Sequence, residues 1–326
     1  MTFRALLLAG LAFLSGCNAQ RFFMVQAVGS LSGYFDHPTS ATESLDEVAP
    51  GVFTFQTHWE RALIVQTRDG LVISDPFNPT FARALRARLE REGLWEPVRA
   101  VVYSHHHLDH VGGAAILEPA EVIAHADVAE HWAQSSPRDV LPPTRLVSGD
   151  TRLSFGSRTI TLVSIPHAHA ETHFALHVNE KVLYAPDTLA PGVMLLGGLP
   201  ATPLEGYFED MAKLGALPFD VFVASHFGYA PKAEFDRTVT MLRDLDTIGR
   251  DVVDERWRDG GFHVDKAELK AAFKDYYDRT HAKYGDWHGF DTHILSAFTR
   301  VYTAVLLGDS APVGASEPGA CHHRAG

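Results

Sequence analysis

The chain has 326 residues, 46% of them hydrophobic and 21% charged, which is the composition of an ordinary globular protein and allows one large domain with an extension. Its 28 Lys and Arg against 40 Asp and Glu give a net charge of −12. No basic stripe is present in the sequence, so these numbers argue against a nucleic-acid partner. Histidine is unusually frequent, at 19 residues.

The first residues are typical of an export signal. Arg4 precedes an apolar run from Ala5 to Leu14 that is too short to span a bilayer. The run ends in Leu-Ser-Gly-Cys and resembles the bacterial lipobox, in which the cysteine, here Cys17, is lipidated and becomes the mature N-terminus. The alternative is an ordinary signal peptide cut after Ala19. Residues 1–17 thus predict an exported lipoprotein facing the periplasm, and Asn18 favours the outer membrane over the inner one.

Residues 18–46 are rich in Gly, Ser and Pro with little periodicity, and they are predicted to form a tether. This lipid anchor is the only membrane attachment we predict. With Cys17 used as the anchor, Cys321 is the one remaining cysteine. The fold is therefore expected to depend on its core and its metals rather than on an internal disulfide.

Short β-branched-rich runs and helical periodicity alternate along the middle of the chain. The predicted strands are 52–55, 62–65, 71–74, 100–104, 158–165, 173–178, 181–185 and 221–225. A helix begins at Pro79 and extends to about Glu92, and three more cover 231–257, 265–284 and 291–307. Strands interleaved with helices imply sheets covered by helices. We predict a domain over 47–230, a helical extension over 231–308 packed on it, and a polar tail over 309–326.

A dense group of metal-ligand residue types follows the predicted strand 100–104. His105 and His107 are two residues apart on a loop that leaves this strand, so both rings can point at one ion. Asp109 and His110 lie close enough to serve a second ion. Zinc prefers imidazole and carboxylate ligands. The spacing therefore predicts a two-metal site within six residues.

The pattern resembles the metallo-β-lactamase superfamily, which carries five short motifs at strand ends. Asp75 resembles the first motif, a carboxylate that orients a ligand loop. The His105–His110 cluster matches the second. For the third, His167 and His169 are both candidates, and spacing to the fourth motif favours His169. Asp187 matches the fourth and His226 the fifth. The resemblance covers residues 51–228.

The resemblance implies a ligand set, cofactors and a fold. One metal would be held by His105, His107 and His169, the other by Asp109, His110 and His226, with Asp187 bridging them. The implied cofactors are two zinc ions, with iron or manganese as alternatives. The implied fold is α/β, the four-layer αβ/βα sandwich, here with a C-terminal helical extension.

Together, the site chemistry and the resemblance predict a metal-dependent hydrolase. A hydroxide shared by two ions would be the nucleophile, with Asp109 as the catalytic residue that orients it. No Gly-x-Ser-x-Gly elbow is present to supply a serine nucleophile instead. The predicted partner is a small-molecule substrate, an ester, lactone or related acyl compound.

Several named activities within the family fit less well. The β-lactamases generally lack an Asp at the bridging position, where Asp187 stands here. The histidine cluster is similar to that of glyoxalase II-type thioesterases, but their cationic glutathione-binding segment is not recognisable. Lactonases for acyl-homoserine lactones tend to carry a Tyr near the bridging Asp, where Thr188 stands here. The family's nucleases add a further domain and a basic surface, and the sequence indicates neither.

Two readings from other classes stay open. An iron-dependent persulfide dioxygenase would use only the first metal set and would contain one iron. A non-catalytic protein with a structural metal would hold its ion with no open coordination position.

Other residues were weighed against ordinary structural roles. His173 and His177 share one face of a strand; His173 could line the active-site mouth, and His177 is more typical of a structural histidine. His106, His125 and His131 are expected to be structural, and Cys321-His322-His323 to lie in a disordered tail. The helical extension contains four residues that either close the pocket or belong to the core: Tyr276, Tyr277, Trp287 and His293.

The segment 189–204 is apolar yet rich in Gly and Pro. Because it follows Asp187 directly, one hypothesis makes it a hydrophobic wall that selects an apolar substrate group, with Met194 and Leu195 in the pocket. The alternative is core packing.

Overall fold

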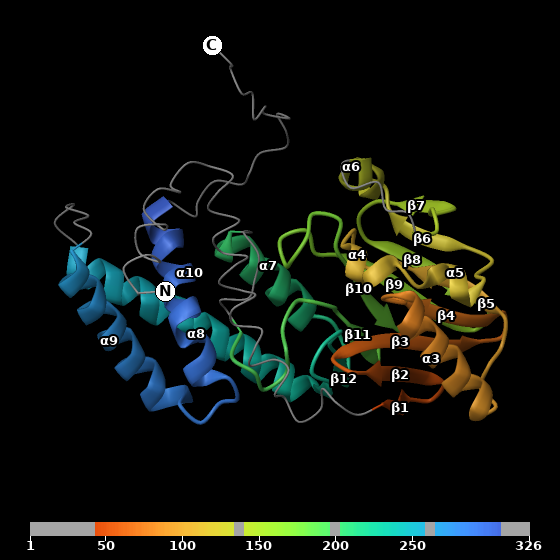
Figure 1. Ribbon diagram of the computed structural model, residues 1–326, viewed down its shortest axis with the longest axis horizontal. Coiled ribbons are helices and arrows are strands. Elements are labelled where there is room, and N and C mark those ends of the chain that lie inside the picture. The colour runs from red at the N-terminus through yellow and green to blue at the C-terminus, as the bar shows by residue number, and fades with distance from the viewer. Residues whose placement is uncertain (1–42, 134–139, 196–202, 258–264, 308–326) are drawn as a thin grey trace, which may run out of the picture.

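Two β-sheets form the centre of the computed structural model, which describes residues 43–133, 140–195, 203–257 and 265–307. The sheets lie face to face, and helices cover the outer face of each (Figure 1). The predicted four-layer αβ/βα sandwich is thereby confirmed, with its C-terminal helices at one side.

Within the described residues the first sheet has seven strands in sequence order. They are β1 (Ser44–Ala49), β2 (Val52–Thr57), β3 (Glu60–Thr67), β4 (Gly70–Ser74), β5 (Val98–Val102), β6 (Val122–His125) and β7 (Arg145–Val147). Strands β1 to β4 form an antiparallel meander, and β4 to β7 run parallel to one another.

The second sheet has six strands in the described part of the chain, in the order β13-β12-β11-β10-β9-β8. Their bounds are β8 (Thr151–Phe155), β9 (Arg158–Ser164), β10 (Phe174–Val178), β11 (Val182–Tyr184), β12 (Val221–Val223) and β13 (Tyr229–Pro231). All neighbours are antiparallel except β11 and β12.

The helices are α3 (Pro79–Arg91), α4 (Leu108–Val111), α5 (Ala114–Leu117), α6 (Val128–Ala133), α7 (Leu204–Gly215), α8 (Lys232–Trp257), α9 (Lys266–Tyr284) and α10 (Phe290–Leu307). Phe81, Leu85 and Leu89 of α3 are buried against the first sheet, as their spacing predicted. On the opposite side, α7 to α10 share one core cluster with the second sheet. Figure 1 shows α9 and α10 at the end of the molecule away from the first sheet.

The two sheets are held together by an apolar layer between them. Leu63 and Val72 come from the first sheet, and Leu162, Leu176 and Tyr184 from the second; all are buried. Every second residue of a strand points to this layer, and the residues between point to the helices. This alternation leaves the strand ends as the places where polar side chains can gather.

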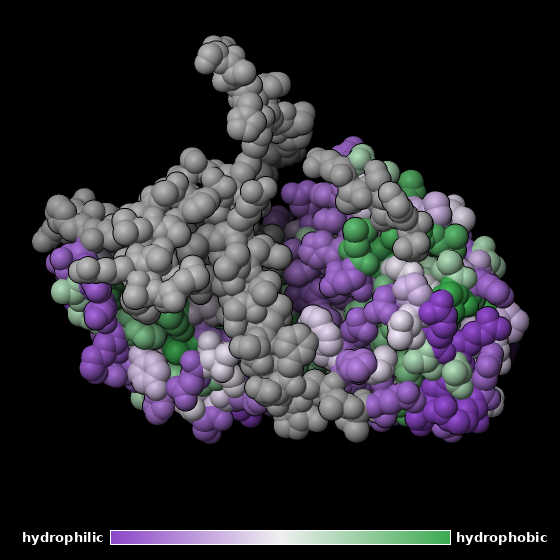
Figure 2. All heavy atoms as spheres, viewed as in Figure 1, coloured by the Kyte–Doolittle hydropathy of each residue, from purple (hydrophilic) through white to green (hydrophobic). Residues whose placement is uncertain are grey.

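The predicted strands and long helices are present, and the structure adds elements that the sequence did not predict. Strand β1 begins inside the predicted tether, because residues 44–49 pair with β2. The short strands β6, β7, β8 and β13 and the 12-residue helix α7 are not among the predicted elements. Among the described residues no helix is both long and apolar enough to cross a membrane. The coloured part of the face in Figure 2 is a mosaic of hydrophilic and hydrophobic residues.

Candidate metal centre

The predicted ligands come from strand ends of both sheets. His105, Asp187 and His226 each lie three residues beyond the last residue of a strand: β5, β11 and β12 respectively. Strand β5 lies in the first sheet and the other two in the second. His169 lies on the loop between β9 and β10. The fold therefore brings together residues that are up to 121 positions apart (226 − 105).

The first ligand set consists of His105, His107, His169 and Asp187, whose ligand atoms all lie within 4.8 Å of one another. Asp187 Oδ2 is 3.5 Å from His105 Nε2 and 3.3 Å from His169 Nε2. His169 Nε2 is 2.9 Å from His107 Nδ1. The structure thus selects His169 from the two candidates for the third motif. His167 is about half exposed, and its backbone N–H donates to Asp210.

The second ligand set consists of His110, Asp187 and His226. Asp187 Oδ2 is 2.9 Å from His110 Nε2, and Asp187 Oδ1 is 3.0 Å from His226 Nε2. Asp187 is therefore shared by both sets, and its two oxygens face different histidines.

Asp109 lies beside the second set rather than within it. Its Oδ2 is 3.8 Å from His110 Nε2, and its side chain is 66% exposed. Asp109 and His110 are consecutive residues of the short helix α4. Successive residues of a helix point about 100° apart, so the buried ring of His110 leaves Asp109 toward solvent. The metal-binding and catalytic roles of Asp109 stay predictions.

Asp75 is the predicted orienting carboxylate, and it is fully buried. It accepts hydrogen bonds from the backbone N–H (2.9 Å) and hydroxyl (2.7 Å) of Ser104 and from the Tyr184 hydroxyl (3.1 Å). Its Oδ2 also lies 3.2 Å from His110 Nδ1. With its Nδ1 held in this way, His110 presents Nε2 to the second set.

Two further contacts orient the remaining groups of the second set. His226 Nδ1 donates to the carbonyl of Trp59 at 3.0 Å, and the Trp59 ring stacks on the His226 ring at 4.3 Å and 18°. Ser225 Oγ donates to Asp187 Oδ1 at 2.6 Å. Asp187 itself has a left-handed backbone, with φ of 53°, and its N–H donates back to Ser225 Oγ.

The donor set fits divalent metal ions. Imidazole nitrogens and carboxylate oxygens are the ligands of catalytic zinc sites. His105 Nε2 is a buried nitrogen without a hydrogen bond, while its Nδ1 lies 2.9 Å from Ser104 Oγ. A buried polar atom left in this state is costly unless something else satisfies it, and an ion among the ligand atoms would do so.

Electrostatics keep most of these histidines neutral and Asp187 charged. Burial lowers the pKa of His107 to about 4 and that of His105 well below the ordinary value. Burial would raise the pKa of Asp187, but His110, His226 and His169 outweigh it and hold that pKa well below its usual range. Neutral imidazole and ionised carboxylate are the forms that bind metals.

We expect the free energy of unfolding of the metal-free protein to fall as the pH drops from about 7 to about 5. Burial lowers the pKa of His105, His107 and His173 in the folded state, whereas the unfolded chain takes up these protons near pH 6.5. Protons bound only by the unfolded state favour unfolding. His110 works in the opposite direction: burial lowers its pKa, but Asp187 and Asp75 outweigh burial and raise it.

Urea unfolding of chelator-treated protein at several pH values measures this effect. His173→Gln should flatten the dependence, and His167→Gln, at a half-exposed position, is the control for loss of a histidine. A free energy that does not change over this range would contradict the expectation.

His173, a candidate either for the active-site mouth or for a structural role, is fully buried behind the ligands. Its ring centroid is 5.0 Å from that of His105 and 5.9 Å from that of His169, and neither of its ring nitrogens has a hydrogen-bond partner among the described residues. It therefore lies next to the first set without a path to solvent of its own.

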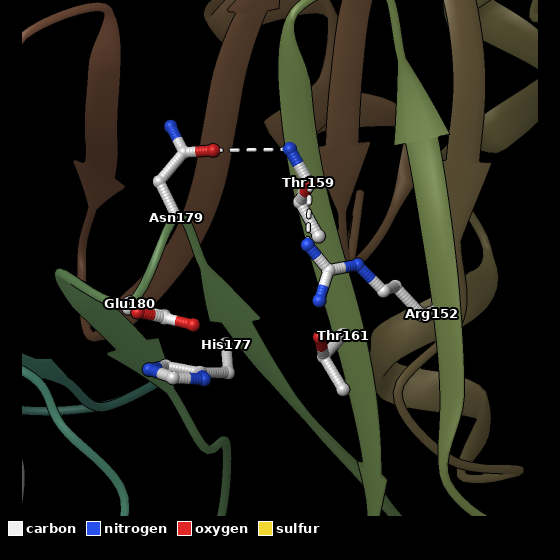
Figure 3. Close-up of a pocket in the computed structure, with 6 residues that line it drawn as sticks. All are labelled: Arg152, Thr159, Thr161, His177, Asn179 and Glu180. Atoms are coloured by element: carbon white, nitrogen blue, oxygen red, sulfur yellow. Dashed lines mark hydrogen bonds between the residues drawn. The ribbon is translucent and has the colours of Figure 1, made fainter.

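His177 belongs to neither ligand set, in accord with the structural role favoured for it. Its Nε2 donates to the carbonyl of Pro218 at 2.7 Å. Figure 3 shows it in a separate polar pocket of about 250 Å³ on β8, β9 and β10, which it lines with Arg152, Thr159, Thr161, Asn179 and Glu180.

The other histidines predicted to be structural make ordinary contacts. The ring of His106 stacks on that of His131, with 3.9 Å between their centroids. Its Nδ1 shares a hydrogen bond with Thr172 Oγ1 at 3.0 Å. His125 Nδ1 accepts from the backbone N–H of Asp127.

The segment after Asp187 has two surroundings. Met194 is fully buried in the core cluster of the helical layer, so core packing, not a place in the pocket, describes it. Leu195 is half-buried and packs on a small apolar cluster beside the second set. We call this the flanking cluster; it contains Trp59, Ala190, Val193, Leu195 and Phe227. Segment 196–202 lies outside the described residues.

The helical extension contributes mainly core residues. Tyr276 and Trp287 are buried in its cluster and Tyr277 packs against it, and His293 is 2% exposed. Residues 1–42, with Cys17, and 308–326, with Cys321-His322-His323, lie outside the described residues.

Sequence reasoning missed several residues that support the site. Ser225 is next to a ligand in the sequence, which was an available signal. Trp59 contacts His226, and its neighbour Glu60 contacts Asn78. Both contacts arise only from the tertiary structure. Burial raises the pKa of Glu60, while His226 and Asn78 oppose the shift.

Comparisons with known proteins agree with this geometry. The α subunit of 2,4-dinitroanisole O-demethylase from Nocardioides sp. (strain JS1661) is 29% identical over 233 residues, covering 70% of this chain and 69% of the relative. Hydroxyacylglutathione hydrolase from Xanthomonas oryzae pv. oryzae is 30% identical over 160 residues, covering 47% and 55%. The chain thus spans about half the length of the second relative.

Solved structures share the fold. The inverting sec-alkylsulfatase from Pseudomonas sp. aligns with a TM-score of 0.56 at 16% identity, covering 78% of this chain and 56% of that chain. A β-lactamase from Chitinophaga pinensis aligns with a TM-score of 0.52 at 18% identity, covering 63% and 93%. Residues 61–226, which contain every residue of the two ligand sets, match the family model of the metallo-beta-lactamase superfamily. The chain belongs to the metallo-beta-lactamase superfamily, and its His and Asp cluster fits a metal-dependent hydrolase.

Proposed function

We propose that this protein is a hydrolase that uses two metal ions, both zinc, to cleave an ester, lactone or related acyl substrate. The observation that carries the proposal is the position of Asp187. Its Oδ2 faces His110, His169 and His105, while its Oδ1 faces His226. One carboxylate thus belongs to both ligand sets.

When bound, two ions would make a water molecule a nucleophile near neutral pH and would polarise the substrate oxygen. The chain's own residues would orient this chemistry. Ser225 fixes the Asp187 carboxylate, and Asp75 and the Trp59 carbonyl present the Nε2 atoms of His110 and His226 to the ion. Asp109, exposed beside His110, would orient the attacking water or accept its proton.

The same observation weighs against a single-iron dioxygenase. That reading needs one metal, held by His105, His107 or His110, His169 and Asp187 in some combination, and it gives no ligand role to His226. Here His110 and His226 both converge on Asp187, and both are oriented through their second nitrogens. Hydrogen bonds that orient both histidines of the second set support a two-metal hydrolase.

The flanking cluster supports an apolar group in the substrate. It lies against the second set, since Trp59 stacks on His226 and Phe227 follows that ligand directly.

The first experiment is metal analysis of the chain purified without added metal, followed by an ester, lactone and thioester panel. We expect close to two zinc ions per chain and hydrolysis that a chelator abolishes and zinc restores. A single iron per chain, together with oxygen uptake on a persulfide, would replace this proposal with the dioxygenase.

We propose in addition that the chain is exported and anchored through a lipid on Cys17. The support is the Leu-Ser-Gly-Cys sequence alone. Mass spectrometry of the N-terminal peptide from membranes tests it, and an unmodified Met1 would contradict it.

A further inference from the structure

The contact between Glu60 and Asn78 lies outside both ligand sets. Asn78 Nδ2 donates to Glu60 Oε1 at 3.1 Å and Oε2 at 3.3 Å. Glu60 is the first residue of β3, and Asn78 precedes α3, so the contact joins the β2–β3 hairpin to the N-terminus of a helix.

Asn78 is itself rigidly held. Its Oδ1 accepts from the backbone N–H groups of Thr80 and Phe81, both at 3.0 Å, and so caps α3. With its oxygen used in this way, the side-chain N–H₂ group is directed at Glu60. The neighbouring Phe77 N–H donates to the carbonyl of His110 at 3.0 Å, which ties this loop to the histidine cluster.

The other end of the contact leads to His226. Thr57 and Glu60 pair across the hairpin, so the turn consists of His58 and Trp59, and His58 has a left-handed φ of 54°. Trp59 makes both contacts that orient the His226 ring: its carbonyl accepts from Nδ1, and its indole stacks on the imidazole. A two-residue turn moves with the strands that close it. Because Glu60 follows Trp59 directly, a shift of Glu60 would move the Trp59 carbonyl.

We propose that Glu60 and Asn78 form a positioning clamp for the second metal. The clamp holds the β2–β3 turn against the loop before α3, which also contacts His110. Trp59 in this turn then fixes the tautomer and the plane of the His226 ring. Neither clamp residue contacts the metal. The inference rests on the proposed two-metal site and predicts a selective effect on one of its two ions.

The test is binding of Zn²⁺ alone to the metal-free full chain, followed by competition with a chromophoric chelator. The wild type should show two binding steps, and His226→Ala identifies the step that belongs to the second set. Loss of a residue that orients a ligand lowers metal affinity about 10–100-fold. We expect Glu60→Ala and Asn78→Ser to weaken the second-set step by this factor and to leave the other step unchanged.

Two conservative choices separate the clamp from other effects. Asn78→Ser keeps an oxygen that caps α3 but removes the donor to Glu60. Glu60→Gln removes the charge but keeps an acceptor for Asn78, so it should retain wild-type affinity. Glu121→Ala is the matched control, because Glu121 is another half-buried glutamate at a strand end, paired with Arg99 and Arg145.

The outcomes separate the clamp from the proposed function. Two unchanged steps in Glu60→Ala and Asn78→Ser would overturn the clamp while leaving a two-metal enzyme. Equal weakening of both steps, or a Glu60→Gln variant as weak as Glu60→Ala, would also overturn it. A wild type that binds only one ion would instead overturn the proposed function.

Discussion

Asp187→Ala should reduce the metal content below two ions per chain and lower kcat by at least about 10²–10³-fold, the cost of losing one preorganised electrostatic group. The reason is that both oxygens of this carboxylate are used. Oδ1 lies 3.0 Å from His226 Nε2, and Oδ2 lies 2.9 Å from His110 Nε2 and 3.3 Å from His169 Nε2. Metal analysis and initial rates on the best ester of the panel measure the two effects.

A graded series makes the result specific. Ser225→Ala removes the hydrogen bond to Asp187 Oδ1 but keeps the ligand, so its effect should be smaller. Asp244→Ala removes a carboxylate that bonds Lys283 and Tyr284 in the helical layer and should leave metal content unchanged. An Asp187→Ala protein that retains two ions at wild-type affinity would show that Asp187 is no ligand.

Asp75→Ala should lower both stability and metal affinity. The variant leaves the backbone and hydroxyl donors of Ser104 and the donor of His110 without their acceptor in a buried site, and each unsatisfied group costs about 1–3 kcal/mol. We therefore expect a fall in the free energy of unfolding of about 3 kcal/mol or more. Zinc affinity should fall about 10–100-fold, because His110 loses the bond that orients it.

Urea unfolding and chelator competition, on metal-free and zinc-loaded protein respectively, give the two numbers. Tyr184→Phe is the control, since it removes one donor to Asp75 and leaves the contact with His110 in place. If Asp75→Ala loses stability but keeps zinc affinity, Asp75 supports the fold only and does not orient His110.

The ligand sets were largely predictable because they depend on local order along the chain. His105, Asp187 and His226 each follow an apolar strand, and such strands are recognisable from their composition. The structure brings both predicted sets together, apart from Asp109. That exception has a local cause, since α4 has four residues, too few to show a helical period.

The residues that orient the ligands could not be predicted in the same way. Glu60 and Asn78 are 18 positions apart, and Trp59 and His226 are 167 apart. Neither pair shares a helix face or a predicted strand pair, so no spacing rule connects them. Met194 shows the same limit: it is buried in a core cluster that also contains residues of α8 and α10, which begin 38 and 96 positions later in the chain.

The shared carboxylate of Asp187 has a consequence for how the protein would take up metal ions. Because Asp187 belongs to both ligand sets, two ions bound as proposed would not bind independently. Whatever factor the first ion imposes on the affinity of the second, the second imposes on the first, since linkage between two sites is reciprocal. The fraction of doubly loaded protein at a given zinc concentration is therefore set by two intrinsic affinities and one coupling factor, and Asp187 is the residue through which that coupling acts.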